Sequence, residues 1–87
     1  MDLKVTTVDV SDTGVATVTL NRPDRGNSWT GRMHAEYRWI MAELERDERV
    51  RVAVLTGAGR AFCVGADTQA LSSYVGGDGY DGGLREE

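Results

Sequence analysis

The sequence has one cysteine, Cys63, and one proline, Pro23, and its first 20 residues show no basic end followed by an apolar block. The lone cysteine excludes an internal disulfide, and no secretory signal is recognisable. Disulfides are rare in the reducing cytosol, so we expect a cytoplasmic protein. A single cysteine more often packs as a small hydrophobe than acts as a catalytic thiol, and we favour the packing interpretation of Cys63.

Long apolar runs and clusters of basic residues are also missing. No stretch approaches the roughly 18 apolar residues that a membrane helix requires, which argues against a membrane partner. Ten lysines and arginines against fourteen aspartates and glutamates give a net charge of −4. Nucleic-acid binding relies on basic stripes, so we expect no nucleic-acid partner. The composition also excludes collagen, coiled coil and wholesale disorder.

What the sequence does contain is a series of alternating and amphipathic segments. Residues 3–10 and 15–20 alternate around a turn at 11–14, which predicts a β-hairpin. Residues 21–27 hold the proline and a glycine and predict a loop. Thr30 is a candidate cap for an amphipathic helix, whose apolar face comprises Met33, Tyr37, Ile40, Met41 and Leu44. We expect solvated positions for His34, Glu36, Glu43, Glu45 and Glu48.

The second half of the chain continues the pattern and then loses it. Residues 50–56 predict a strand buried in a sheet, and residues 65–71 a tight turn that opens a weak helix. Residues 75–83 are rich in glycine and aspartate, which predicts a loop. These elements leave a sheet with an unpaired edge. We therefore interpret residues 1–87 as the N-terminal part of a single larger α/β domain, with 76–87 as a loop at its end.

Two glycine-rich stretches invite ligand interpretations that their residues do not support. Gly57-Ala58-Gly59 follows a strand as a dinucleotide fingerprint would, but the third glycine of that pattern falls at Phe62. A turn after a strand is the simpler interpretation. Residues 76–81 match the beginning of a calcium-binding repeat, but they occur once, and such repeats need stacked neighbours. We expect a loop there and no metal site.

The turn at Gly65-Ala66-Asp67 is the strongest candidate for chemistry. If a helix begins at Asp67, the backbone N–H groups around the turn point outward, unpaired, at the positive end of the helix dipole. Such groups can bind an anion or stabilise a developing oxyanion. In the structural alternative, Asp67 caps its own helix and the turn holds no ligand.

Three segments in this order resemble the N-terminal part of the enoyl-CoA hydratase/isomerase (crotonase) family. They are the strand and loop of residues 15–23 with Asn27, the amphipathic helix, and residues 52–67 with their Phe-Cys-x-Gly-Ala-Asp turn. The likeness covers roughly residues 3 to 71. It implies the N-terminal part of an α/β, crotonase-like fold, which is a spiral of β-β-α units, and chemistry on acyl-CoA thioesters.

The resemblance also implies roles for individual residues. In the family, the backbone N–H of the alanine in Gly-Ala-Asp donates to the thioester oxygen as an enolate forms, and that alanine is Ala66 here. Contacts with the substrate and its coenzyme A portion are expected from Asp24, Arg25, Gly26, Val64, Ala66, Asp67, Thr68 and Gln69. Coenzyme A is part of the substrate, and no separate cofactor is expected. The implied partners are further copies in a trimer or hexamer and the C-terminal remainder of the same protein.

The sequence departs from the family pattern at a few positions. Gly26 stands where the family commonly has an apolar residue. Ser28-Trp29 stands where a small residue followed by an aliphatic residue is common, and Thr68-Gln69 stands where an aliphatic residue and often a lysine are expected. The expected activity is that of an enoyl-CoA hydratase. The alternatives are an enoyl-CoA isomerase or another acyl-CoA lyase or hydrolase of this family, a non-catalytic fragment without independent activity, and a small α/β interaction domain that shares only the motifs.

Overall fold

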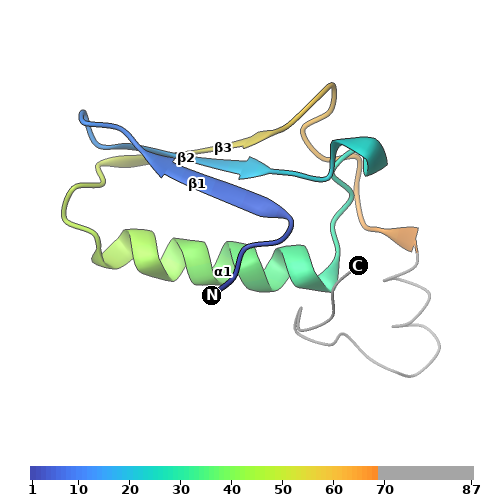
Figure 1. Cartoon of the computed structure of the whole chain (residues 1–87), viewed down its shortest axis with the longest axis horizontal. Coiled ribbons are helices and arrows are strands. Elements are labelled where there is room, and N and C mark those ends of the chain that lie inside the picture. Colours follow the sequence, from blue (N-terminus) through green and yellow to red (C-terminus); the bar gives the residue numbers. More distant parts are fainter. Residues whose placement is uncertain (69–87) are drawn as a thin grey trace.

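The computed structural model describes residues 1–68. They form β1 (Thr6–Val10), β2 (Val15–Leu20), the 3₁₀-helix η1 (Pro23–Arg25), α1 (Gly31–Arg46) and β3 (Val52–Gly57), in that order. The sheet lies along one side of α1 (Figure 1). Within residues 1–68, no helix is both long and apolar enough to cross a membrane. The predicted loop at 76–87 lies outside the described residues.

Strand β2 is the centre of a three-stranded sheet with the order β1-β2-β3. β1 pairs with β2 antiparallel, which confirms the predicted hairpin, although the first strand begins at Thr6 rather than at Leu3. β3 pairs with β2 parallel, and Leu20 lies opposite Gly57. The connection from β2 to β3 contains α1, which is the usual way to return a parallel strand to its sheet.

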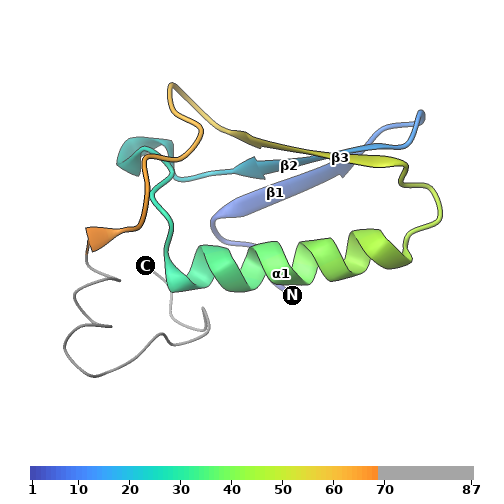
Figure 2. The ribbon, with the colours of Figure 1, turned by 180° about the vertical axis from the view of Figure 1, so that it is seen from behind.

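The core lies on the face of the sheet that α1 covers. Alternate residues of β2, namely Ala16, Val18 and Leu20, are fully buried. Leu20 packs with Met33 of α1 and with Val5, which precedes β1. The two ribbon views agree that, within residues 1–68, the opposite face of the sheet has no covering element (Figures 1 and 2).

The expectation that the third strand is buried in the sheet is wrong for the described residues. β3 is an edge strand, and Val52 and Val54 are 51% and 45% exposed. Its bounds also shift from the predicted 50–56 to 52–57, because the Val50 N–H bonds to the Asp47 carbonyl in the turn after α1. Val52 and Val54 lie opposite Val15 and Thr17 of β2, so their side chains are on the face away from α1, which no described element covers.

The helix α1 is capped as the sequence predicts. The Thr30 hydroxyl accepts a hydrogen bond from the Met33 N–H at 3.1 Å. Of the predicted apolar face, Met33 and Ile40 are buried, whereas Tyr37, Met41 and Leu44 are half-buried. The prediction for His34 is wrong in part: it is half-buried, and its ring lies edge-on to Trp29 with the ring centroids 6.4 Å apart. Among the predicted solvated acids, Glu45 and Glu48 are exposed and Glu43 is half-buried.

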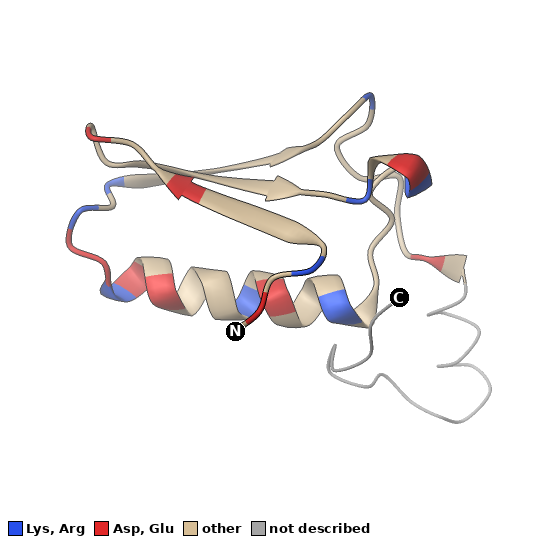
Figure 3. Ribbon diagram, in the orientation of Figure 1, with Lys and Arg blue, Asp and Glu red and all other residues tan. Residues whose placement is uncertain are grey.

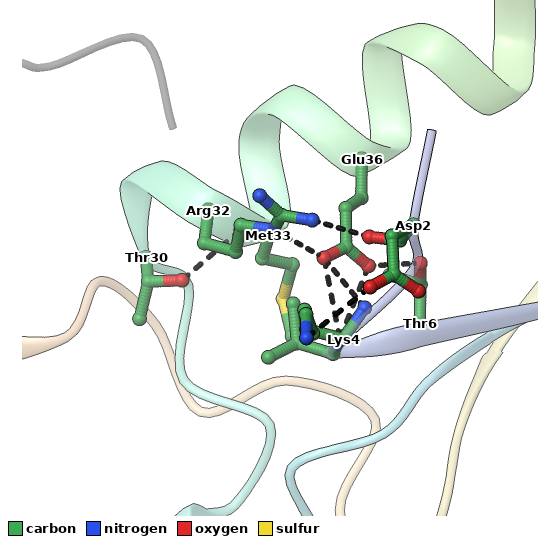
Figure 4. A network of polar contacts seen from close by, with 8 residues as sticks. Asp2, Lys4, Thr6, Thr30, Arg32, Met33 and Glu36 are labelled. Carbon is green, nitrogen blue, oxygen red and sulfur yellow. Dashed lines mark hydrogen bonds and ion pairs between the residues drawn. The ribbon is translucent and has the colours of Figure 1, made fainter. Parts of the chain in front are cut away.

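The prediction that Glu36 is solvated is wrong, because this residue is fully buried in a polar network between α1 and the N-terminal segment (Figure 4). Its carboxylate accepts hydrogen bonds from the Thr6 hydroxyl at 2.6 Å, from the backbone N–H groups of residues 4 and 5, and from Arg32 Nε at 2.7 Å. Arg32 also donates to the carbonyl of Asp2. Burial alone would raise the pKa of Glu36, but these hydrogen bonds outweigh it and hold the pKa below its ordinary value of 4.5.

Candidate functional site

The site predicted from the sequence lies where two loops meet at one end of the sheet. Residues 21–30 follow β2 and residues 58–67 follow β3. Since β2 and β3 run parallel, both loops leave the sheet at the same end, where the two strands finish, and they lie side by side beyond it (Figures 1 and 2). Ligands commonly bind at the carboxyl ends of parallel strands. Both loops carry arginine at this end of the molecule (Figure 3).

Backbone hydrogen bonds join the two loops. The Val64 N–H donates to the Gly26 carbonyl at 3.1 Å, and the Trp29 N–H donates to the Gly65 carbonyl at 2.8 Å. The Asp67 N–H donates back to the Trp29 carbonyl, also at 2.8 Å. The structure therefore brings Gly26 and Val64 into direct contact, although they are 38 residues apart in the chain (64 − 26).

Asn27 links the loops through its side chain, which is fully buried. Its Oδ1 accepts a hydrogen bond from the Arg22 N–H at 2.7 Å. Its Nδ2 donates to the carbonyls of Ala58 and Ala61 at 2.9 and 2.8 Å. The backbone φ of 55° lies in the left-handed region, which asparagine adopts more readily than most residues. The sequence identifies Asn27 only as one residue of a family motif. The structure shows that its side chain joins the loop after β2 to the loop after β3.

Gly57 allows the loops to approach this closely. A Cβ at this position would lie 2.6 Å from the Ala61 carbonyl oxygen and 2.7 Å from Asn27 Nδ2. Gly26 meets a similar limit, because its φ is 60° and a Cβ there would lie 2.9 Å from a methyl group of Val64. The apolar side chain that the family pattern places at position 26 is therefore excluded here by Val64 and by the backbone conformation.

Ala66 presents its backbone N–H away from the neighbouring loop. It forms an isolated parallel bridge with Trp29, in which the flanking residues, Gly65 and Asp67, make the hydrogen bonds. The N–H of the central residue of such a bridge points to the opposite side. Within residues 1–68 the Ala66 N–H has no hydrogen-bond partner, and the residue is exposed. Helical backbone begins at Thr68, directly after Asp67.

The carboxylate of Asp67 is buried instead of exposed beside Ala66. Asp67 is 7% exposed, and its Oδ2 accepts a hydrogen bond from the Ser28 hydroxyl at 3.0 Å. The same oxygen lies 3.4 Å from a guanidinium nitrogen of Arg22, which also donates to the Ser28 carbonyl at 2.8 Å. Any contact of Asp67 with a ligand in this conformation is therefore made by its backbone rather than by its carboxylate.

The remaining predicted binding residues lie at the surface. Asp24 and Arg25 are exposed on η1, Val64 is 69% exposed, and Thr68 is exposed. Gln69 lies outside the described residues. The structure thus places Gly26, Val64 and Ala66 on joined loops, and their roles in binding stay predictions.

Two other interpretations of the sequence concern packing and metals. Cys63 is half-buried and packs against the core cluster of Val5, Leu20 and Met33, as a small hydrophobe would. Across residues 1–68, no group of three or more histidine, cysteine, aspartate or glutamate residues could hold a metal ion.

A β-hairpin followed by a covering helix and a parallel strand is one β-β-α unit of an α/β fold. Solved structures show which fold. One is an enoyl-CoA hydratase/isomerase from Mycobacterium paratuberculosis, which is 44% identical with a TM-score of 0.72 over 78% of this chain and 26% of its own. The chain therefore has the crotonase fold, as its N-terminal part. Residues 11–80 match the family model described as enoyl-CoA hydratase/isomerase, and the chain belongs to this family.

Curated relatives carry names of two activities. The 1,2-epoxyphenylacetyl-CoA isomerase of Escherichia coli is 52% identical over 54 residues, which are 62% of this chain and 21% of the relative. A Mycobacterium tuberculosis protein named a probable enoyl-CoA hydratase is 48% identical over 65 residues, which are 75% of this chain and 25% of the relative. The chain thus spans only about a fifth to a quarter of the length of these relatives.

Proposed function

We propose that the protein is an enoyl-CoA hydratase, which adds water across the double bond of a 2-enoyl-CoA thioester. The observation that carries the proposal is the outward N–H of Ala66, which has no partner within residues 1–68 and lies where two loops join. Membership of the family and relatives named as hydratases support it. Coenzyme A enters as part of the substrate.

In this proposal the Ala66 N–H donates a hydrogen bond to the thioester oxygen. As water adds to the double bond, negative charge develops on that oxygen, and the hydrogen bond strengthens. An interaction that is stronger in the transition state than in the substrate lowers the barrier. Loss of one such donor typically costs about 100- to 1,000-fold in rate.

The coenzyme A portion is proposed to lie across the joined loops. The contacts come from residues 24–26 of η1 and its end, from Val64, and from residues 67–69. Arg25 is the candidate for a phosphate of coenzyme A, because it is exposed and its guanidinium matches a phosphate group in shape and charge. The exposed charges of the two loops are those of Asp24, Arg25 and Arg60, and this excess of positive charge favours an anionic ligand at this end.

Water activation is assigned to residues beyond Glu87, in the part of the relatives' length that this chain does not span. The two buried carboxylates of the described part, Glu36 and Asp67, both accept hydrogen bonds from protein groups. Glu36 binds donors of the N-terminal segment, and Asp67 binds the hydroxyl of Ser28 in the neighbouring loop. We therefore assign neither carboxylate to acid–base chemistry. We therefore expect the 87-residue chain alone to have no hydratase activity, and robust turnover by the purified chain would contradict this assignment.

The test is an assay of the protein produced from its complete reading frame. Crotonyl-CoA loses its conjugated absorbance on hydration, and we expect this loss with the protein and not with buffer. A protein that binds crotonyl-CoA without hydrating it would refute the hydratase proposal. Oligomeric state is measured on the same sample by light scattering, where we expect a trimer or hexamer.

Isomerisation of an enoyl-CoA is the second candidate; the family model is described as hydratase/isomerase, and the relative with 52% identity is named an isomerase of another acyl-CoA, 1,2-epoxyphenylacetyl-CoA. Both reactions develop charge on the thioester oxygen, so the Ala66 N–H serves either one. A 3-enoyl-CoA substrate separates them. An isomerase converts it to the conjugated 2-enoyl thioester and absorbance rises, whereas a hydratase acts only on the conjugated form.

A further inference from the structure

A buried polar cluster lies one residue beyond the Ala66 N–H and has no part in the chemistry described above. Ser28 and Asp67 are 8% and 7% exposed, and the side chain of Arg22 is 10% exposed. One guanidinium nitrogen of Arg22 lies 2.8 Å from the Ser28 carbonyl, 3.2 Å from its hydroxyl and 3.4 Å from Asp67 Oδ2. The Ser28 hydroxyl donates to the same Asp67 oxygen at 3.0 Å.

The cluster connects three separate parts of the fold. Arg22 lies just after β2, Ser28 lies just before α1, and Asp67 follows β3. The side chain of Asp67 is therefore anchored to both ends of the loop at residues 21–30. The backbone of the turn is also bonded to Trp29: the Asp67 N–H donates to the Trp29 carbonyl, and the Trp29 N–H donates to the Gly65 carbonyl.

The peptide that carries the Ala66 N–H is held directly by the hydrogen bond from the Trp29 N–H to the Gly65 carbonyl at 2.8 Å. Gly65, which precedes Ala66, has a φ of 127°, and among the described residues beyond its two chain neighbours no heavy atom lies within 4 Å of where its Cβ would be. No side chain at Gly65 adds to this hydrogen bond in limiting the adjoining peptide. Trp29 thus holds the peptide before Ala66, and the buried carboxylate of Asp67 anchors the residue that follows Ala66.

We propose that Ser28 and Arg22 are positioning residues, which hold the Asp67 carboxylate and thereby set the direction of the Ala66 N–H. The inference rests on the proposed function of this N–H as the donor to the thioester oxygen. A donor held in place before the reaction stabilises developing charge without reorganisation, whereas a donor displaced by about 1 Å loses up to 100-fold in rate.

The test compares Ser28→Ala with Ser11→Ala in the protein from the complete reading frame. Ser11 is a matched control, because its hydroxyl also accepts a hydrogen bond, from the Val15 N–H at 3.1 Å, but in the exposed hairpin turn. The measurements are the residual dipolar coupling of the Ala66 N–H in ¹⁵N-alanine-labelled protein, kcat and KM for crotonyl-CoA, and the melting temperature. Ser28→Thr restores the hydroxyl and serves as the rescue variant.

We expect Ser28→Ala to change the coupling of Ala66 but not that of Ala16 in β2, and to lower kcat about tenfold with KM within about twofold. Ser28→Thr restores both values, and Ser11→Ala changes neither. A Ser28→Ala protein with a lower melting temperature but an unchanged Ala66 coupling and kcat would overturn the proposal, because Ser28 would then only stabilise the fold.

Failure of the proposed function gives a different result. If the unaltered protein does not act on any enoyl-CoA, the coupling of Ala66 in the ligand-free variants still decides whether Ser28 orients this N–H. A changed coupling supports the positioning role, and an unchanged coupling refutes it.

Discussion

Replacement of Asn27 by aspartate tests how the two loops of the site are held together. Aspartate has the same shape and keeps an oxygen for the Arg22 N–H. It exchanges Nδ2, which donates to Ala58 and Ala61 at 2.9 and 2.8 Å, for a second carboxylate oxygen. At neutral pH this oxygen faces two carbonyl oxygens, so two hydrogen bonds become two repulsive contacts at a fully buried position.

The magnitude follows from these contacts. Two lost hydrogen bonds cost about 1 kcal/mol each, and leaving two buried carbonyls opposite a charge costs about 2 kcal/mol more. We therefore expect Asn27→Asp to lower the free energy of unfolding by about 4 kcal/mol at neutral pH. Asn27→Ala loses all three side-chain hydrogen bonds and places alanine in the left-handed region, which also totals about 4 kcal/mol.

The two variants differ in their response to acid. Burial and the facing carbonyls raise the pKa of the introduced carboxyl above its unfolded value, which is about 3.9. The protonated form donates one hydrogen bond, so the variant regains stability as the pH falls through this raised pKa, and loses it as the pH rises. Asn27→Ala introduces no titratable group, so its loss of unfolding free energy relative to the unaltered protein does not change with pH.

The assay is urea denaturation of the unaltered protein and both variants, expressed from the complete reading frame, at about pH 7 and about pH 4.5. We expect the deficit of Asn27→Asp to shrink by about 2 kcal/mol in acid, while that of Asn27→Ala does not change. If Asn27→Asp is as stable as the unaltered protein at pH 7, or loses the same amount at both values, the Nδ2 hydrogen bonds do not hold the loops.

Three further predictions concern other parts of the structure. Glu36→Gln is expected to lower the free energy of unfolding by about 2 kcal/mol at neutral pH. Since hydrogen bonds hold the Glu36 pKa below 4.5, this loss should shrink as the pH falls from 4.5 through the lower pKa of the folded protein; a pH-independent loss in urea denaturation would contradict this. Gly57→Ala is expected to cost about 3 kcal/mol in the same assay, because its Cβ would lie 2.7 Å from Asn27 Nδ2; unchanged stability would show that the loops can separate. Arg25→Gln is expected to raise KM for crotonyl-CoA about fivefold without changing kcat, whereas the control Arg38→Gln on α1 does neither; equal effects would remove Arg25 from the phosphate site.

The features that the sequence predicts correctly are local. The hairpin, the Thr30 cap and the residues of α1 depend on spacings of two to four residues, which can be counted along the chain. No spacing in the sequence predicts the contact between Gly26 and Val64, but the resemblance to the enoyl-CoA hydratase/isomerase family implies that both residues belong to one site.

The features that were missed depend on distant partners. Glu36 has the spacing of a surface residue on α1, but the N-terminal segment folds over it and supplies donors from residues 30 to 32 positions away. The burial of Asp67 likewise requires Ser28, 39 residues away. The exposure of Val54 follows from its pairing opposite Thr17, which places its side chain on the sheet face that α1 does not cover, and only the register of the strands reveals this.

The most direct test of the central claim follows the amide of Ala66 by NMR while ligand is added. Butyryl-CoA carries the thioester but no double bond to hydrate, and free coenzyme A lacks the thioester. We predict that butyryl-CoA moves the Ala66 amide proton downfield and that free coenzyme A leaves it nearly unchanged, while both shift residues 24–26. An Ala66 signal that butyryl-CoA leaves in place, although the ligand binds, would contradict the assignment of this N–H as the thioester donor.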